Sequence, residues 1–432
     1  MKIKSLIFLN LRKIIFFLII FSLSFQVGFH FWPAFSRIAG IRVDYLSPTT
    51  YLLDILIIVF ILVSGFEFWL GRKKAVIRVN FIVAAVLTLF VFDILLNLFI
   101  VASPQAHLLG IIKIIEFSFF AFFVAYSFKK ADIPYFVDAL ALSALVSSTL
   151  SIWQFVKQSS IGGLWYFLGE RTFNTSTIGI STVNLDQQIL RAYGAFPHPN
   201  VLAFFLFAAI VFATLRFPFE KRVFEKVFLI FTIIISSVAL FLTFSRILIL
   251  VALSFLFFDF FSKSKSNKLR LVLVLVSLGA FYILFSFPWF ISFLTRGIDF
   301  RRELLDQSLM ILSSNLYFGV GLNNFFIHQA PLIKTISPII FQPPHNIFIL
   351  ALVQTGILGF LVFAYLLALS FRSVSKKLRH ATRDTRNFYK GVLVLLISVI
   401  IVGMFDHFFL TLQQGQLIFA LILGLSFSKI KG

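Results

Sequence analysis

Apolar runs of about 20 residues recur along the whole chain, separated by short polar segments rich in lysine and arginine. A run of this length lets one helix cross the hydrocarbon core of a bilayer, where only helices and closed barrels satisfy every backbone group. The pattern predicts an all-α, polytopic integral membrane protein with about 12 transmembrane helices. We expect the spans at 14–32, 49–70, 79–101, 108–127, 135–156, 199–215, 227–244, 247–262, 271–289, 346–370, 391–405 and 410–428.

The composition supports a single multi-spanning domain over residues 1–432. The chain is 60% hydrophobic and has a mean hydropathy of +1.00, whereas soluble domains are about half apolar. The two longest connections between spans are 157–198 and 290–345, and the second precedes the tenth helix. The chain has no cysteine, which excludes disulfides, thiolate nucleophiles and thiolate metal sites.

The net charge of +21 comes from lysines and arginines in the short segments between spans. With the N-terminus in the cytoplasm, most of the 38 basic residues fall on the cytoplasmic side, as the positive-inside rule requires. We therefore expect both termini to be cytoplasmic and the connections 157–198 and 290–345 to lie outside. The basic faces favour contact with anionic membrane lipids. Because they are spread over several short segments, they do not indicate a nucleic-acid partner.

Residues 227–262 test this topology because they contain too many apolar residues for one straight span. We expect two short helices that split at Ser245 and Arg246, since a single helix would place the basic segment 371–390 outside. Arg246 then lies on the side where basic residues are scarce, and a charge in a tight apolar hairpin is costly. Its side chain either snorkels to the surface or receives an anion.

Two segments place a histidine and an asparagine at the mouth of a predicted helix. The sequence Phe341-Gln342-Pro343-Pro344-His345-Asn346 runs into an apolar segment, and its prolines favour extended backbone before the helix starts. His345 and Asn346 should then lie in the first turn, where an imidazole can exchange protons near neutral pH. Pro199 suits a first turn as well, so it places His198 and Asn200 in a similar setting. A histidine that only caps a helix is the alternative.

Arg191, Arg246, Arg301 and His345 fall on one predicted membrane face. Guanidinium groups bind diphosphate oxygens through paired, charge-assisted hydrogen bonds, and a nearby imidazole can take the proton of an attacking hydroxyl. The pattern therefore suits transfer of a group from a lipid diphosphate to a hydroxyl, with His345 as catalytic base and the arginines on the leaving group. No metal is required if the arginines neutralise the diphosphate. The acids of the predicted outer segments show no metal-ligand spacing: Asp44, Glu170, Asp186, Asp299, Glu303 and Asp306.

Several neighbours of these residues could support the site. Arg302 follows Arg301, and Gly319 and Gly321 permit a tight turn or a close backbone approach in the same connection. Gly-x-Gly is a weak nucleotide signal here because no predicted strand precedes it.

Five charged residues lie in or near the predicted spans: Asp54, Asp93, Lys113, Glu116 and Asp138. Lys113 and Glu116 are three residues apart and can pair on one helix face. A transporter would use such charges as a relay or an ion site. We favour structural pairing because the charges are few and scattered.

Four segments, in this order, resemble the O-antigen ligase and polymerase family of bacterial envelope proteins. They are Arg191 through Pro199-Asn200, then Thr243-Phe244-Ser245-Arg246, then Arg301 through Phe318-Gly319-Val320-Gly321-Leu322-Asn323-Asn324-Phe325, then Pro344-His345-Asn346 continuing to Gln354-Thr355-Gly356-Ile357-Leu358-Gly359. The likeness runs from about residue 130 to the C-terminus, and the first half matches only as hydrophobic spans. The chain departs from the family at Gln354, where an acid is common, and at Leu316, where a proline is common.

The resemblance implies a metal-independent, cofactor-free membrane glycosyltransferase of the bacterial cytoplasmic (inner) membrane. It implies an undecaprenyl-diphosphate-linked glycan as donor, inversion at the anomeric carbon, and a glycan, glycolipid or protein as acceptor. It leaves open whether the chain is a ligase, a polymerase or a protein oligosaccharyltransferase. A transporter or flippase for a glycolipid or a small anion is the competing interpretation.

Overall fold

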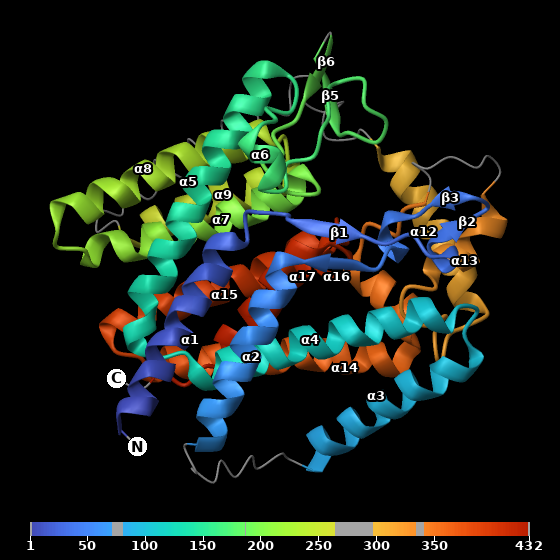
Figure 1. Ribbon diagram of the computed structural model, residues 1–432, viewed down its shortest axis with the longest axis horizontal. Helices are drawn as coiled ribbons and strands as arrows, with labels where there is room; N and C mark the ends of the chain where they lie inside the picture. The colour runs from blue at the N-terminus through green and yellow to red at the C-terminus, as the bar shows by residue number, and fades with distance from the viewer. Residues whose placement is uncertain (1, 71–80, 186, 264–296, 334–340, 431–432) are drawn as a thin grey trace.

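The computed structural model of the protein describes residues 2–70, 81–185, 187–263, 297–333 and 341–430 (Figure 1). Most of these residues are helical. The helices are α1 (Lys2–Ser22), α2 (Leu52–Leu70), α3 (Phe81–Ile100), α4 (Pro104–Ser127), α5 (Ile133–Lys157), α6 (Leu164–Phe167), α7 (Pro199–Arg216), α8 (Val223–Leu242), α9 (Arg246–Lys263), α12 (Ile298–Ser313), α13 (Phe325–Gln329), α14 (Ile347–His380), α15 (Arg383–Gly403), α16 (Phe408–Thr411) and α17 (Gln413–Phe427).

The helices agree with the expected spans in most of the described chain. Within it, seven helices are long and apolar enough to cross a membrane, which makes this a multi-pass membrane protein. The expected span 271–289 lies outside the described residues, and every other expected span overlaps a helix. The total of about 12 spans stays a prediction. The split of 227–262 is found where it was expected: α8 ends at Leu242, Phe244 adopts a left-handed φ of 49°, and α9 begins at Arg246.

The prediction for the first span, 14–32, is wrong at its end. The helix α1 stops at Ser22, and Gly28–His30 form strand β1, which pairs antiparallel with β4 (Thr49–Tyr51). The backbone of 28–30 therefore bonds to another strand instead of continuing the helix. The predicted span was too long because Phe29 and Phe31 add apolar content to this segment. In the structure both are exposed aromatic side chains on the hairpin.

The all-α prediction holds for the membrane-spanning part, and short hairpins were missed outside it. Besides β1–β4, the strands are β2 (Arg37–Ile38) paired with β3 (Ile41–Arg42), and β5 (Thr182–Leu185) paired with β6 (Gln187–Leu190). These hairpins, with α12 and α13, lie toward the top and right of Figure 1, away from the chain termini at lower left. We call this the hairpin side.

The helix α7 is the centre of the bundle. Nearly all its side chains are buried, and α5, α8, α9 and α15 pack around it. Its apolar residues face every direction, as an interior helix requires. At its first turns, the ring of Phe204 meets that of Phe409 edge-on at 4.8 Å between centroids. This contact fixes α7 against α16 and thereby seats the segment 404–412, which joins α15 to α17 and which we call the elbow.

The Gly-x-Gly segment packs against a break in α14. The backbone of Gly356 leaves the helical region there, with φ of 60°. Val320 N donates to Val353 O and Gly321 N to Gln354 O, each at 2.9 Å. A Cβ on Gly319 would lie 2.5 Å from Gly356 N, so this close approach requires glycine. The two glycines therefore hold the connection against α14.

Candidate active site

The hairpin side gathers polar side chains from four separate parts of the chain. Three of these parts are the segment before α7, the turn between α8 and α9, and the segment before α14; the fourth is the elbow. Arg191 joins the first two, because its Nε donates to Thr243 O at 2.5 Å. Asn200 joins the first to the elbow, because its Nδ2 donates to Asp406 Oδ2 at 2.5 Å. His345 joins the last two, because its ring lies 4.9 Å from that of His407.

Arg191 donates three hydrogen bonds to other residues of the protein. Besides the bond to Thr243 O, its Nη1 donates to Ser181 Oγ and its Nη2 to Asn200 Oδ1, both at 2.7 Å. A guanidinium has five N–H groups, so two remain for a ligand. Burial, reinforced by the nearby cations Arg246 and Arg301 and opposed by Tyr193 and Asp406, lowers the pKa of Arg191 to about 10. The group stays charged at neutral pH.

The structure therefore brings both Arg246 and Arg301 within electrostatic reach of Arg191. Arg301 also acts on His345 and His407, since it lowers the pKa of both imidazoles. The four residues that the sequence predicted as a constellation thus share one region. Together with His198, Asp406 and His407 they form what we call the arginine–histidine centre.

Asp406 and His407 were not predicted from the sequence. Both are buried, at 5% and 4% exposure. Burial raises the pKa of Asp406, whereas His407, His345 and His198 lower it when they carry a proton and the hydrogen bond from Asn200 lowers it in either state. The backbone N of His407 donates to its other oxygen at 2.7 Å. An Asp-His pair in the short gap between two predicted spans was the available signal, and it was overlooked because the pair matches no motif.

The histidines of the centre are neutral at physiological pH. Burial lowers the pKa of His345 below its ordinary value, with Asp406 opposing and Arg301 reinforcing the shift. Burial and the neighbouring cations bring the pKa of His198 and of His407 to about 3. His407 Nδ1 lies 2.7 Å from Thr411 Oγ1, whose hydroxyl donates to His407 O at 3.1 Å. A neutral imidazole can accept a proton, so His345 is available as a base.

The two predicted helix mouths differ in which residue forms the cap. His198 Nδ1 accepts from Asn200 N at 3.1 Å at the start of α7. At α14 the cap is Asn346, whose Oδ1 accepts from the backbone N of Phe348 and of Ile349. His345 lies just outside the helix and not in its first turn, because Asn346 is the capping residue. Its Nε2 lies 3.3 Å from Gln342 Oε1, and its Nδ1 is buried.

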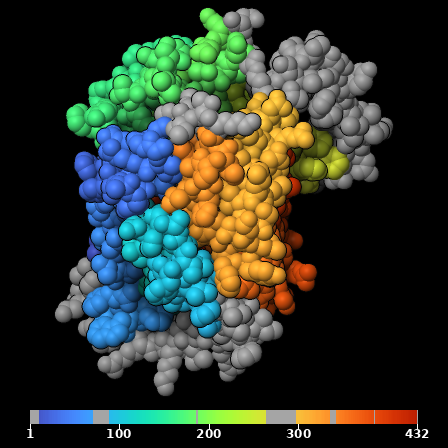
Figure 2. Space-filling model, turned by 90° about the vertical axis from the view of Figure 1, so that its right-hand side faces the viewer, coloured from blue at the N-terminus to red at the C-terminus, as the bar shows by residue number. Residues whose placement is uncertain are grey.

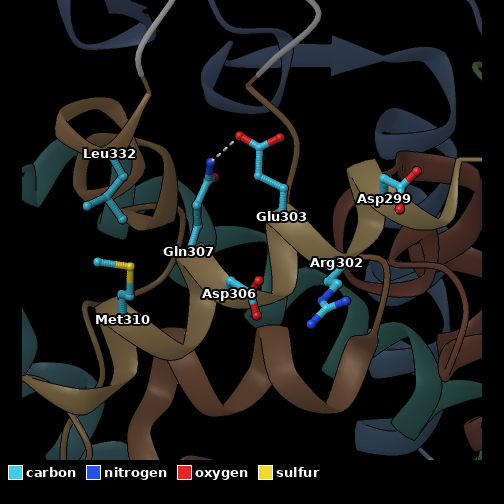
Figure 3. Close-up of a pocket in the computed structure, with 7 residues that line it drawn as sticks. All are labelled: Asp299, Arg302, Glu303, Asp306, Gln307, Met310 and Leu332. Atoms are coloured by element: carbon cyan, nitrogen blue, oxygen red, sulfur yellow. Dashed lines mark hydrogen bonds between the residues drawn. The ribbon is translucent and has the colours of Figure 1, made fainter.

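Arg302 lies apart from the centre. It lines an open hollow of about 460 Å³ on the exposed face of α12, with Asp299, Glu303, Asp306, Gln307, Met310 and Leu332 (Figure 3). Figure 2 shows this α12 region on the molecular surface beside α3. The predicted supporting glycines, Gly319 and Gly321, hold the backbone against α14. None of these three residues makes a hydrogen bond to the histidines in the described part of the chain.

The charged residues within the helices form ion pairs in most cases. Lys113 Nζ lies 2.8 Å from Asp54 Oδ2 and 3.0 Å from Glu116 Oε2, and Asp138 pairs with Arg216 at 2.5 Å. Asp54 also accepts a hydrogen bond from Gln413 at the start of α17. Asp93 is buried, and its carboxylate has no hydrogen-bond partner among the described residues.

One cluster of side chains in the centre has the residue types that could hold a metal ion. His345, Asp406 and His407 each offer one ligand atom, and these atoms lie within 4.8 Å of one another. The arginines nearby oppose a bound divalent cation, and both oxygens of Asp406 already accept hydrogen bonds. These observations argue against a metal, and the expectation of a metal-independent reaction stays a prediction.

A comparison with known protein families gives a match in the middle of the chain. Residues 231–364 match the O-Antigen ligase family. This range contains Arg246, Arg301 and His345, whereas Arg191 and Asp406 lie outside it. No curated protein matches the chain significantly. The family match confirms the resemblance that the motifs indicated: residues 231–364 of this multi-pass membrane protein are similar to the O-Antigen ligase family.

Proposed function

We propose that the chain transfers a glycan from an undecaprenyl-diphosphate carrier to an acceptor hydroxyl at the outer face of the bacterial cytoplasmic membrane. The observation that carries the proposal is the arginine–histidine centre itself. It combines Arg191, which has Arg246 and Arg301 within electrostatic reach, with a neutral, half-buried histidine. The family match supports the same class of reaction.

In the proposed reaction, His345 takes the proton of the acceptor hydroxyl as its oxygen bonds to the anomeric carbon of the donor. The bond between that carbon and the diphosphate oxygen breaks, and the diphosphate leaves with the electron pair. Arg246 and Arg301 stabilise the growing negative charge on the diphosphate. Arg191 contributes its positive field and its two remaining N–H groups, while its other bonds hold the loops together.

Replacement of the arginines tests the donor site. Lysine keeps the charge but loses the planar fork, so Arg246→Lys and Arg301→Lys should retain part of the activity and alanine almost none. Arg191→Lys should lose more than either, because one ammonium cannot replace three divergent bonds. The measurement is transfer by purified protein from carrier-linked glycan to a defined acceptor. Arg302→Ala, on the hollow of α12, is the matched control for Arg301→Ala.

Full activity with lysine at all three positions would exclude bidentate recognition of the diphosphate. Full activity with alanine at all three would remove the arginines from the mechanism.

A transporter or flippase is the competing proposal, and it places function in the charges within the helices. The pairing of Lys113 with Asp54 and Glu116 supports a structural role for those charges. Alanine at Asp93, Lys113 and Glu116 should leave glycan transfer intact in folded protein, whereas alanine at Arg246, Arg301 and His345 should abolish it. The opposite pattern would favour transport.

The orientation of the centre can be measured directly because the chain lacks cysteine. We expect a cysteine at Ser313 to react with an impermeant reagent in whole cells and a cysteine at Ser375 to remain unreacted. The reverse result would place the centre in the cytoplasm and contradict the proposed outer-face reaction.

A further inference from the structure

Three glutamines form a hydrogen-bonded series that runs from the hollow on α12 to His345. Gln307 Nε2 donates to Glu303 Oε1 at 3.3 Å, and Gln307 Oε1 accepts from Gln329 Nε2 at 2.9 Å. Gln329 Nε2 also donates to the backbone O of Gln342 at 3.1 Å. Gln342 Oε1 lies 3.3 Å from His345 Nε2. The series therefore joins α12, α13 and the segment before α14.

The first two glutamines are held rigidly. Gln307 is 6% exposed and Gln329 is fully buried. Buried amides that bond to one another have few alternative positions, since a broken bond leaves an unsatisfied polar group that costs about 1–3 kcal/mol. Gln329 thus fixes the backbone of Gln342, and this in turn places the Gln342 side chain beside the imidazole.

The contact between Gln342 and His345 favours one tautomer of the neutral imidazole. An amide oxygen only accepts hydrogen bonds, so the contact is a hydrogen bond only when His345 Nε2 is protonated. The neutral imidazole then has its lone pair at Nδ1. That atom is buried and has no hydrogen-bond partner among the described residues. Its lone pair is therefore unused among the described residues, and a substrate hydroxyl reaches it once the side chains that cover it move aside.

We propose that Gln342 is a positioning residue that holds His345 as the Nε2–H tautomer, so that Nδ1 takes the proton of the acceptor hydroxyl. This inference rests on the proposed transferase function and deepens it. A carboxylate in the same place would orient the ring but would also attract a proton to it. A neutral amide orients the ring and leaves it unprotonated, which suits a base.

The experiment is the pH dependence of single-turnover transfer by the purified full-length protein. The donor is carrier-diphosphate-linked glycan, and the variants are Gln342→Glu and Gln342→Met. The charged or titratable groups that act on His345 stay the same in both: Asp406, His407, His198 and Arg301. Only the partner of Nε2 changes.

Gln342→Glu should move the acidic limb of the profile upward by about one pH unit, because a carboxylate close to an imidazole raises its pKa by about 1–3 units. At alkaline pH this variant should approach wild-type turnover, since it still accepts from Nε2–H. Gln342→Met cannot accept, so its turnover should fall about tenfold at every pH, which is less than the roughly 10²–10⁴-fold that a general base contributes. The fraction of protein that binds donor should stay near the wild-type value in the same preparation, which a general folding defect would not produce.

Gln354→Glu is the matched control, because it makes the same charge change on α14 outside the series. It should leave the acidic limb in place. If Gln342→Glu also leaves it in place while His345→Ala abolishes transfer, the positioning role is wrong and the proposed function stands. If His345→Ala retains full transfer, the base assignment itself fails. Should Gln342→Glu not fold, Gln329→Met tests the same series one step further from the ring, and unchanged turnover in that variant would overturn the proposal.

Discussion

The mouths of α7 and α14 use the same residue types for opposite purposes. Before α7 the histidine caps the helix, since His198 Nδ1 accepts from Asn200 N, and the asparagine side chain bridges Arg191 and Asp406. Before α14 the asparagine caps the helix, since Asn346 Oδ1 accepts from two backbone N–H groups, and the histidine lies next to the elbow. In each case the side chain that does not cap contacts the elbow, Asn200 at Asp406 and His345 at His407.

A shift of the proline relative to the histidine explains the difference. Pro199 follows His198 and occupies the first helical position, so the histidine before it becomes the cap. Pro344 precedes His345, so the helix starts two residues after the histidine and Asn346 becomes the cap. A short motif at the start of a helix therefore does not by itself reveal which of its residues is functional. The position of the proline within the motif does.

The largest loss of transfer activity is expected when His345 is replaced. His345→Ala should leave a folded, inserted protein that binds donor but transfers it about 10²–10⁴-fold more slowly, which is the usual contribution of a general base. His345→Gln keeps hydrogen bonding without basicity and therefore separates a base from an orienting group. The assay uses purified protein, carrier-linked glycan and a defined acceptor. Wild-type turnover by His345→Ala would remove this histidine from the mechanism.

The second effect is at Asn200, the residue freed from capping at α7. Asn200→Ala removes the bridge between Arg191 and Asp406 and leaves a buried carboxylate short of one donor. Loss of such a bond costs about 1–3 kcal/mol, which corresponds to roughly 5–150-fold in transfer if it falls on the active geometry. Asn346→Ala is the matched change at the other mouth and should cost far less activity. Equal losses at the two asparagines would contradict the comparison.

The pH dependence of transfer gives a smaller effect with a definite sign. Burial lowers the pKa of His345 below 6.5. The neutral imidazole is the active form, so transfer should be constant through neutral pH and fall about tenfold per unit below the folded pKa. His198 and His407, with a pKa of about 3, stay neutral over the same range. Arg301→Lys should keep the limb. In Arg301→Ala, where transfer is almost lost, the pKa of His345 measured by NMR titration should rise because a cation is removed. An unchanged pKa in that variant would separate this arginine from the base.

Much of this fold could be predicted because apolar length and proline position act locally. The helix α2 and the split between α8 and α9 followed from the number of apolar residues that one span can hold. The hairpins could not be predicted in this way, because β1 pairs with β4 although residues 31–48 separate them, and the exposed aromatic residues near β1 resemble part of a span. Strand pairing is a long-range property that hydropathy does not carry.

The candidate site was only partly predictable for a related reason. Arg191, Arg246, Arg301 and His345 could be grouped because each lies at a predicted helix end on one side. Asp406 belongs to the group only because the ring of Phe409 packs against Phe204 and brings the elbow to α7. The glutamine series depends in the same way on contacts between α12, α13 and the segment before α14. Such contacts arise from tertiary packing and leave no periodic signal in the sequence.

The smallest effects are expected for the two capping residues, His198 and Asn346. They test whether these two side chains serve only as caps. His198→Ala removes the cap of α7 and Asn346→Ala that of α14, and each should lower the stability of the protein by about 1 kcal/mol, as loss of a side-chain cap usually does. Thermal unfolding in detergent should therefore shift in the same direction and by a similar amount for both variants. Transfer measured well below the unfolding temperature should change little in either, because neither side chain is asked to move a proton. If His198→Ala slows transfer as much as His345→Ala while unfolding at the wild-type temperature, His198 is part of the chemistry. The position of the proline relative to the histidine would then be insufficient to assign roles to the residues at the starts of α7 and α14.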